Sequence, residues 1–467
     1  MESMIRKLLS VLTLGALASN ASAENLLDVY QQALEYDPQY RAGIAQHDAD
    51  KEVYEQARAF LLPTLDLELS HTQTYQKIIK TDNPILSSRD STDYPTNELN
   101  LSLTQSIYSY SNWAEFAQAK QDVKGVAAEL EDVRQELMLR VSRAYFMVLK
   151  RRDTYLGIDA EVKSLEEVNE FVKTQAANGL ARKTDALDAE ARLLQAQARK
   201  IEVGNALRDS LQGLYEITGN VPPTMATLGE ELALVKPDPF QVESWLSNAQ
   251  KNNPSIIAKQ SALESAREDI RSQKGGHYPE LDLVANYNIT EVKGTLFDGQ
   301  SELETADVMI RLKVPLYAGG SVSSRVRETE SLYHKSRNEL EQTWRQTSRE
   351  THDAFTGVTS SISKVQALKK SVEAYESAVE FKEQSFESGV ATSITVLDAV
   401  RDLFIARTEY SAARYDYLYN NLRLKRAVGT LTEFDLQQIN NTLQGKEVPT
   451  DLSVLDEDLE ISKLVLY

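Results

Sequence analysis

Two short stretches of the chain place the same residues at the same spacing, and each ends on a carboxylate. Residues 176–189 read AANGLARKTDALDA, and residues 386–399 read FESGVATSITVLDA, so a glycine and a Leu-Asp-Ala tripeptide recur with an offset of 210. Acidic, hydroxyl and basic side chains at such turns could attract ions or bond one turn to another. The sequence therefore raises the question of what chemistry these paired turns perform.

The residue types needed for catalysis or cofactor binding do not come together. The segment Gly179-Leu180-Ala181-Arg182-Lys183-Thr184 faintly resembles a phosphate loop, but the glycine before Lys-Thr is missing and no strand precedes it. The histidines show no metal-ligand spacing, and the chain has no cysteine. They are His47, His71, His277, His334 and His352. We therefore expect no enzyme activity, no metal and no cofactor.

The N-terminus predicts export. Arg6-Lys7, an apolar run from Leu8 to Ala18 and the small residues Ala21-Ser22-Ala23 indicate a signal peptide over residues 1–23, with a run too short to span a membrane. No later stretch approaches the ~20 apolar residues of a membrane-spanning helix. The formal net charge of −19 argues against nucleic acid as a partner.

The spacing of prolines and apolar residues predicts very long helices. No proline falls between Pro95 and Pro222 or between Pro315 and Pro449, and good helix formers are abundant in both windows. Glycine-containing turns break each window once, so helices are expected over 111–178, 184–218, 321–386 and 392–428. Apolar residues recur in steps of three and four, which is typical of packed long helices. One such series is Leu187, Ala191, Leu194, Ala198 and Ile201.

Four stretches alternate apolar and polar residues and predict two β-hairpins, at 63–108 and 279–317. Leu65, Leu67 and Leu69 show the pattern, alternating with polar residues. Long polar loops, at about 78–96 and 290–306, join the strands of each pair. The segments are about 10 residues long, which is enough to cross a bilayer when tilted.

The two halves repeat the same order of elements. Pro63-Thr64-Leu65-Asp66-Leu67 corresponds to Pro279-Glu280-Leu281-Asp282-Leu283, with an offset of 216. We therefore expect an internal duplication of helix, hairpin, long helix, turn and short helix. The boundaries are 24–220 for the first repeat, 221–240 for a linker, 241–430 for the second repeat, and 431–467 for a C-terminal segment with an acidic tail.

Four amphipathic strands cannot close into a membrane barrel, because the smallest such barrels have about eight. Either the strands form a soluble sheet on a helical core, or several chains share one barrel. Aromatic residues at the strand-to-helix junctions favour the shared barrel, where they would form an interfacial girdle. They are Tyr108, Tyr110, Trp113 and Tyr317.

With these elements in place, the chain resembles the TolC family of outer-membrane channel tunnels. Segments that carry the resemblance include Leu61-Leu62-Pro63, Leu103-Thr104-Gln105-Ser106-Ile107, Pro315-Leu316-Tyr317-Ala318-Gly319-Gly320 and Val396-Leu397-Asp398-Ala399. The resemblance implies an α+β membrane protein, a homotrimer with a 12-stranded barrel in outer-membrane lipid. A coiled-coil helical barrel with a small mixed equatorial region would cross the periplasm. It also implies an exit duct for drugs or secreted proteins that works with an inner-membrane transporter and a periplasmic adaptor.

The resemblance also assigns a role to the two turns, as the periplasmic entrance. The family carries two aspartates three residues apart in the second turn, which form acidic rings in the trimer. Here Asp398 matches one of them, but Thr395 stands at the other position. One acidic ring is therefore expected, although Asp398 could instead pair with Arg401 one helical turn further on.

A second feature implied by the resemblance is a latch between the turns. Thr184 and Asp185, which follow Gly179, match its first half, but the second turn around Gly389 departs from the pattern. Phe386 stands in place of a tyrosine, and Ala391 in place of an arginine. The sequence hypothesis is that Arg182 or Lys183 replaces the latch by reaching Asp398; the alternative is closure by coil packing alone.

The alternative class is a secreted coiled-coil structural or adhesive protein without a channel. It would explain the helices but not the membrane-length strands. The sequence does not separate drug efflux from protein secretion, nor does it show which transporter and adaptor would bind. The two long loops could be phage or toxin receptors on position alone.

Overall fold

The computed structural model describes residues 25–80, 82, 91–229, 231–294, 299–443 and 447–450. The expected signal peptide and most of the acidic tail lie outside these residues. The chain divides into two compact units: residues 1–45, 130–254 and 344–467 form unit 1, and residues 46–129 and 255–343 form unit 2. Within the described residues, no helix is both long and apolar enough to cross a membrane.

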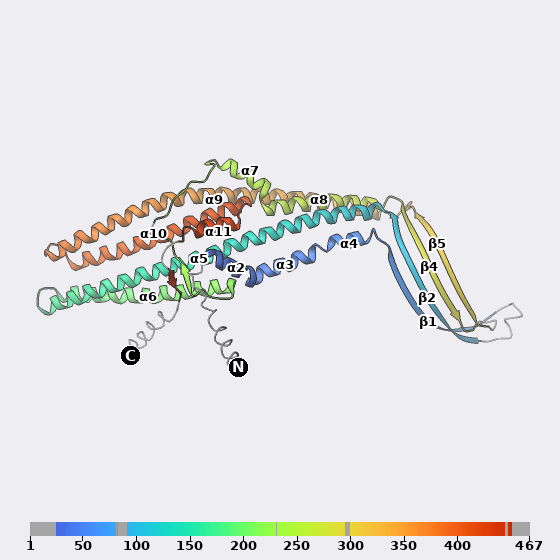
Figure 1. Cartoon of the computed structure of the whole chain (residues 1–467), viewed down its shortest axis with the longest axis horizontal. Helices are drawn as coiled ribbons and strands as arrows, with labels where there is room; N and C mark the ends of the chain where they lie inside the picture. The colour runs from blue at the N-terminus through green and yellow to red at the C-terminus, as the bar shows by residue number, and fades with distance from the viewer. Residues whose placement is uncertain are drawn as a thin grey trace, which may run out of the picture. The chain divides into compact units, whose positions relative to one another are not determined.

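The helices are α2 (Leu26–Tyr36), α3 (Pro38–Asp50), α4 (Val53–Ala59), α5 (Tyr110–Ala177), α6 (Lys183–Thr218), α7 (Val242–Asn252), α8 (Pro254–Gly275), α9 (Ser321–Glu387), α10 (Ser393–Val428) and α11 (Glu433–Asn440). The strands are β1 (Thr64–Lys77), β2 (Ser91–Tyr108), β3 (Thr224–Ala226), β4 (Glu280–Val292), β5 (Ser301–Lys313) and β6 (Glu447–Pro449). Figure 1 shows their order along the chain. The four longest helices begin and end within one residue of the positions expected from the sequence.

Unit 2 contains one four-stranded antiparallel sheet in the order β1-β2-β4-β5 (Figure 1). Its strands have 13 to 18 residues and are longer than the expected ten. They extend into segments expected to be loops, because backbone pairing continues through polar residues such as the Tyr75–Asp93 and Glu291–Glu302 pairs. The strands β1 and β5 are the two edges, and no other described strand pairs with their outer sides.

Unit 1 has its main core where α2, α5, α6, α9, α10 and α11 converge. Tyr30, Leu137, Tyr145 and Leu422 are fully buried there. Local signals place the helix ends: Asn25 and Asp28 form a capping box at the start of α2. The helix α10 ends at Gly429 in the left-handed conformation. The small sheet of β3 and β6 lies beside this core, with the hydroxyl of Tyr145 donating to the carbonyl of Ala226.

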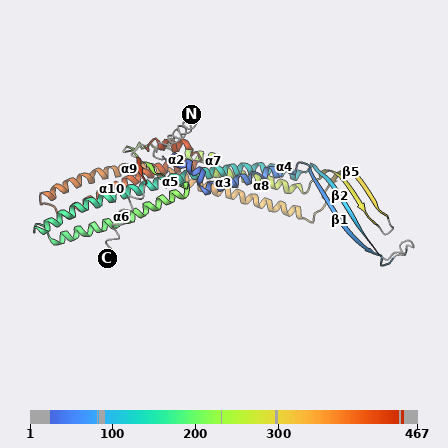
Figure 2. The same cartoon turned by 60° about the horizontal axis from the view of Figure 1, so that its bottom comes forward.

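Two antiparallel helical hairpins extend from the core of unit 1, α5 with α6 and α9 with α10 (Figure 2). The first is held by ion pairs along its length, Lys173 with Glu190 at 3.2 Å and Arg199 with Glu161 at 2.7 Å. A smaller apolar cluster joins the two hairpins. It consists of Val162, Leu165, Ala189, Ala196 and Leu397.

Candidate functional site

The turns at the tips of the two hairpins have the same backbone geometry. In the first, the amides of Leu180 and Ala181 both donate to the carbonyl of Gln175. In the second, the amides of Val390 and Ala391 donate to the carbonyl of Ser385 in the same way. These bonds satisfy carbonyl groups that the ending helix leaves unpaired.

Each turn requires its glycine. Gly179 has φ of 76° and Gly389 has φ of 75°, a left-handed conformation that costs other residues roughly 1 kcal/mol or more. A Cβ atom at either position would meet no atom of the described residues within 4 Å. The reason for glycine is therefore the backbone conformation alone, and the repeated sequence encodes a repeated turn.

The acidic residue of the second turn is held by a cation from the other hairpin. Nη1 of Arg192, on α6, lies 2.5 Å from Oδ1 of Asp398, on α10. Nη1 of Arg401 lies 3.4 Å from the same oxygen, while its Nη2 is closer to Asp402, at 2.8 Å. Asp398 therefore makes the contact with Arg401 considered from the sequence, and a shorter one that links the hairpins.

The expected replacement latch differs from the structure. Among the described residues, the ion pairs of Asp398 are with Arg192 and Arg401, and neither Arg182 nor Lys183 pairs with it. Arg182 precedes Arg192 by ten residues, which is ~15 Å along a helix and beyond the reach of one side chain. The hypothesis that Arg182 or Lys183 holds Asp398 is therefore corrected: Arg192 holds it.

The residues expected at the rest of the latch make other contacts. The hydroxyl of Thr184 lies 3.4 Å from the carboxylate of its neighbour Asp185, and the hydroxyl of Thr395 donates to the carbonyl of Thr392. The ring of Phe386 meets that of Phe171, on α5, edge-on with centroids 5.6 Å apart. Phe386 thus bridges the hairpins without the hydroxyl that a tyrosine would supply.

A buried charged pair lies deeper in the first hairpin. Glu161 is almost fully buried and accepts a hydrogen bond from Arg199, but its Oε2 has no hydrogen-bond partner among the described residues. A buried carboxylate is tolerated when such a partner offsets its lost hydration. This pair joins α5 to α6, and the apolar cluster that includes Leu397 packs the two hairpins together next to Arg192 and Asp398.

In unit 2, the sheet has one continuous apolar face, which is exposed on the edge strands β1 and β5 and half-buried on the central strands β2 and β4. Leu67, Leu101, Tyr287 and Ala306 form one row across the four strands, and apolar side chains occupy most positions of the rows on either side. From Leu281 to Ile289 the band covers eight residue-to-residue steps, or ~27 Å along an antiparallel strand, close to the ~25 Å apolar band of outer-membrane barrels.

Polar and aromatic residues bound this band. At one end is the row of His71, Asn97, Glu291 and Glu302, where the amide of Asn97 donates to Glu291 at 2.8 Å. At the other end lie the aromatic residues expected at the junctions. Tyr108, Trp113 and Tyr317 are exposed, and the ring of Tyr110 contacts that of Tyr278 at 4.9 Å between centroids.

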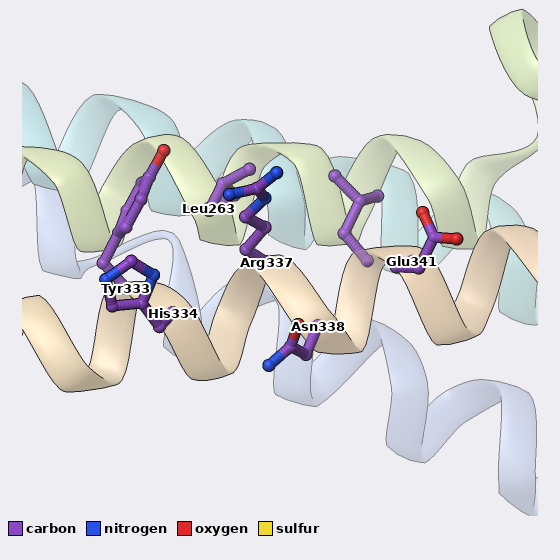
Figure 3. Close-up of a pocket in the computed structure, with 7 residues that line it drawn as sticks. Leu263, Tyr333, His334, Arg337, Asn338 and Glu341 are labelled. Atoms are coloured by element: carbon purple, nitrogen blue, oxygen red, sulfur yellow. The ribbon is translucent and has the colours of Figure 1, made fainter.

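In the part of the chain that the structure describes, we find no catalytic or metal centre besides these features. A pocket of about 420 Å³ between α8 and α9 is lined by Leu263, Tyr333, His334, Arg337, Asn338, Leu340 and Glu341 (Figure 3). These side chains do not combine a nucleophile with a positioned base. Within the described residues, no three acidic or histidine side chains are grouped as metal ligands.

The repeated helical hairpins and exposed sheet define a class of protein. The profile of the family described as "Outer membrane efflux protein" matches residues 29–220 and 245–430, and the chain belongs to this family. It is an outer-membrane exit duct for drugs or proteins that extends into the periplasm, and not an enzyme. Family membership rules out the alternative of a secreted adhesive protein.

Named relatives cover almost the whole chain. The outer membrane protein TolC of Escherichia coli is 32% identical over 96% of this chain and 91% of its own length. TolC of Vibrio cholerae is 30% identical over 92% and 96%. The alkaline protease secretion protein AprF of Pseudomonas aeruginosa is 29% identical over 93% and 90%. The solved structure of the Campylobacter jejuni CmeC outer membrane channel has the same fold, with a TM-score of 0.75 at 14% identity over 91% of this chain and 90% of that one.

Proposed function

We propose that three copies of the chain form one duct, in which the four-stranded sheets join into a 12-stranded barrel above a helical coiled-coil tunnel. The observation that carries this proposal is the sheet itself: its apolar face has bilayer length, and no other described strand pairs with the outer sides of its edge strands β1 and β5. An open edge in lipid leaves backbone groups unsatisfied at several kcal/mol each. Pairing β5 of one copy with β1 of the next removes both edges.

The internal duplication expected over 24–220 and 241–430 fits this duct. Each repeat supplies one hairpin of strands to the barrel and one hairpin of helices to the tunnel. The aromatic residues Tyr108, Tyr110, Trp113 and Tyr317 form its interfacial girdle. An inner-membrane transporter and a periplasmic adaptor deliver the cargo to the tips of the helices.

The entrance is gated at the two turns. Contacts between the hairpins, Arg192 with Asp398 and Phe171 with Phe386, hold the tips together at rest, and opening separates them. The relatives' names span solvent efflux and protease secretion, so the cargo is a small molecule or a secreted protein.

The test is electrophoresis and conductance on the full mature protein, purified from outer membranes in mild detergent. We expect a band that migrates as a trimer without heating and as a monomer after boiling, and a small conductance in planar bilayers, as for a closed entrance. A monomer that gives no channels would refute the proposal.

A further inference from the structure

The pocket between α8 and α9 has the size of a ligand site, and the proposed duct does not explain it. Its volume of about 420 Å³ is within the roughly 300–1,000 Å³ of small-molecule sites. Leu263 of α8 lies on one side, and the other lining residues belong to the segment 333–341 of α9. Both walls come from one chain, so the pocket does not depend on pairing between copies.

Ion pairs join the two walls near either end of the pocket. Nζ of Lys259, on α8, lies 3.7 Å from Oε2 of Glu339, on α9. Nζ of Lys274, on α8, lies 3.8 Å from Oε1 of Glu330, on α9. Leu263 lies between the two lysines along α8. The contacts that hold the walls together are therefore present without an occupant.

Arg337 brings an unpaired positive charge to this pocket. Its guanidinium forms no ion pair with any residue that the structure describes, and the nearby carboxylates of Glu264 and Glu339 pair with other cations. Figure 3 shows the side chain of Arg337 extending from α9 toward α8, beside Leu263. Because a guanidinium can bind a carboxylate through two parallel hydrogen bonds, Arg337 is suited to hold an organic acid.

The neighbouring side chains supply a second donor and an apolar surface. Tyr333 lies one helical turn before Arg337 and extends toward α8 on the same side (Figure 3). Among the described residues its hydroxyl has no hydrogen-bond partner, so it can donate to a ligand. Leu263 and Leu340 are half-buried and can contact the apolar part of a ligand. The lining therefore suits an amphipathic molecule.

The charges around the pocket favour a ligand with a single negative charge. Glu341 lines the same wall one helical turn beyond Arg337, and its carboxylate would repel a second negative charge. The chain as a whole also carries a formal net charge of −19. One guanidinium can neutralise one carboxylate, whereas a phosphate monoester carries up to two charges near neutral pH.

We propose that the pocket binds a small amphipathic monocarboxylate. Its carboxylate accepts hydrogen bonds from Arg337 and Tyr333, and its apolar body lies against Leu263 and Leu340. The inference goes beyond the proposed duct, because it adds a ligand site to the helical part of unit 2.

The test uses naphthoate as the probe, with naphthamide and naphthyl phosphate as analogues that keep the apolar body and change the charge. Binding is measured by equilibrium dialysis with the full mature protein in mild detergent, and protein-free micelles are the blank. The variants are Arg337→Gln and Tyr333→Phe. The matched control is Arg327→Gln, because Arg327 is also an exposed arginine of α9 without an ion pair among the described residues, but it does not line the pocket.

We expect saturable binding of naphthoate to the wild type and equally to Arg327→Gln. Arg337→Gln should weaken this binding about 10-fold and Tyr333→Phe severalfold, since a hydrogen bond to a charged group contributes more than one between neutral groups. The wild type should bind naphthamide and naphthyl phosphate about 10-fold more weakly than naphthoate.

Three results would overturn the proposal: no saturable binding of naphthoate, equal binding by the wild type and Arg337→Gln, or equal or tighter binding of either analogue. Arg337 is exposed, so its replacement removes no buried partner, and the heat-sensitive trimer and the conductance should stay as in the wild type. A failure of the pocket would therefore leave the proposed duct standing, and the two can be distinguished on the same sample.

Discussion

Replacing Arg192 with Gln should weaken the closed entrance. The pair with Asp398 is 31% and 37% exposed, so solvent screens it and its contribution is that of a partly exposed ion pair, ~1 kcal/mol. If the three copies of the proposed trimer open together, the free energy that favours the closed state over the open state falls by ~3 kcal/mol. Since 1.4 kcal/mol is a factor of about 10, the open population should rise by about 100-fold.

The assay is single-channel recording in planar bilayers with the wild type, Arg192→Gln, Asp398→Asn and the double variant. We expect both single variants to open more often and the double variant to be little worse than either, because each removes the same interaction. Cation selectivity distinguishes the two single variants. Arg192→Gln removes the cation that pairs with the Asp398 carboxylate and should raise the cation selectivity, whereas Asp398→Asn removes the carboxylate charge and should lower it.

The matched control is Glu190→Gln. Glu190 pairs with Lys173 near the same tip and is similarly exposed, but both residues belong to the first hairpin. Its loss should leave the open population unchanged. The reasoning is refuted if Arg192→Gln keeps the wild-type open population, if the effects of Arg192→Gln and Asp398→Asn simply add, or if Glu190→Gln opens the channel equally.

Two further predictions concern stability in unit 1. Gly429→Ala would place a Cβ 2.3 Å from the carbonyl oxygen of Asn252 at a φ of 78°, so it should lower the free energy of unfolding by about 3 kcal/mol. Gly389→Ala should lower it by only ~1 kcal/mol, because its Cβ would meet no atom of the described residues within 4 Å. Urea unfolding compares the two variants, and equal losses of stability would contradict the packing argument. Burial, together with the carboxylate of Asp153, raises the pKa of Tyr415, so the folded chain favours the neutral phenol. Its contribution to stability is present below the unfolded pKa of ~10 and is lost as the pH rises above that value. In urea titrations at alkaline pH, the wild type should therefore lose stability more steeply with rising pH than Tyr415→Phe. Parallel curves of stability against pH for the two proteins would contradict this.

Local sequence alone determined the elements of this protein. Proline-free windows, apolar spacing and the glycines of the two turns predicted the long helices to within a residue, because helix formation and termination depend on neighbours a few positions apart. Gly179 and Gly389 adopt the left-handed conformation that their turns require. Alternation likewise predicted the hairpins, although the strands extend further because pairing across the sheet also orders polar residues.

Tertiary structure decided which side chains meet across the hairpins. The choice of Arg192 rather than Arg182 or Lys183 as the partner of Asp398 depends on the relative height of α6 and α10, which the packing of Leu397 against Ala189 and Ala196 sets. No pattern within either turn encodes that height, because the two partners are 206 residues apart. The same packing buries Ala189 and Ala196 but leaves Leu187, Leu194 and Ile201 exposed. The sequence alone predicts one helix here and does not show which of its two apolar stripes is covered.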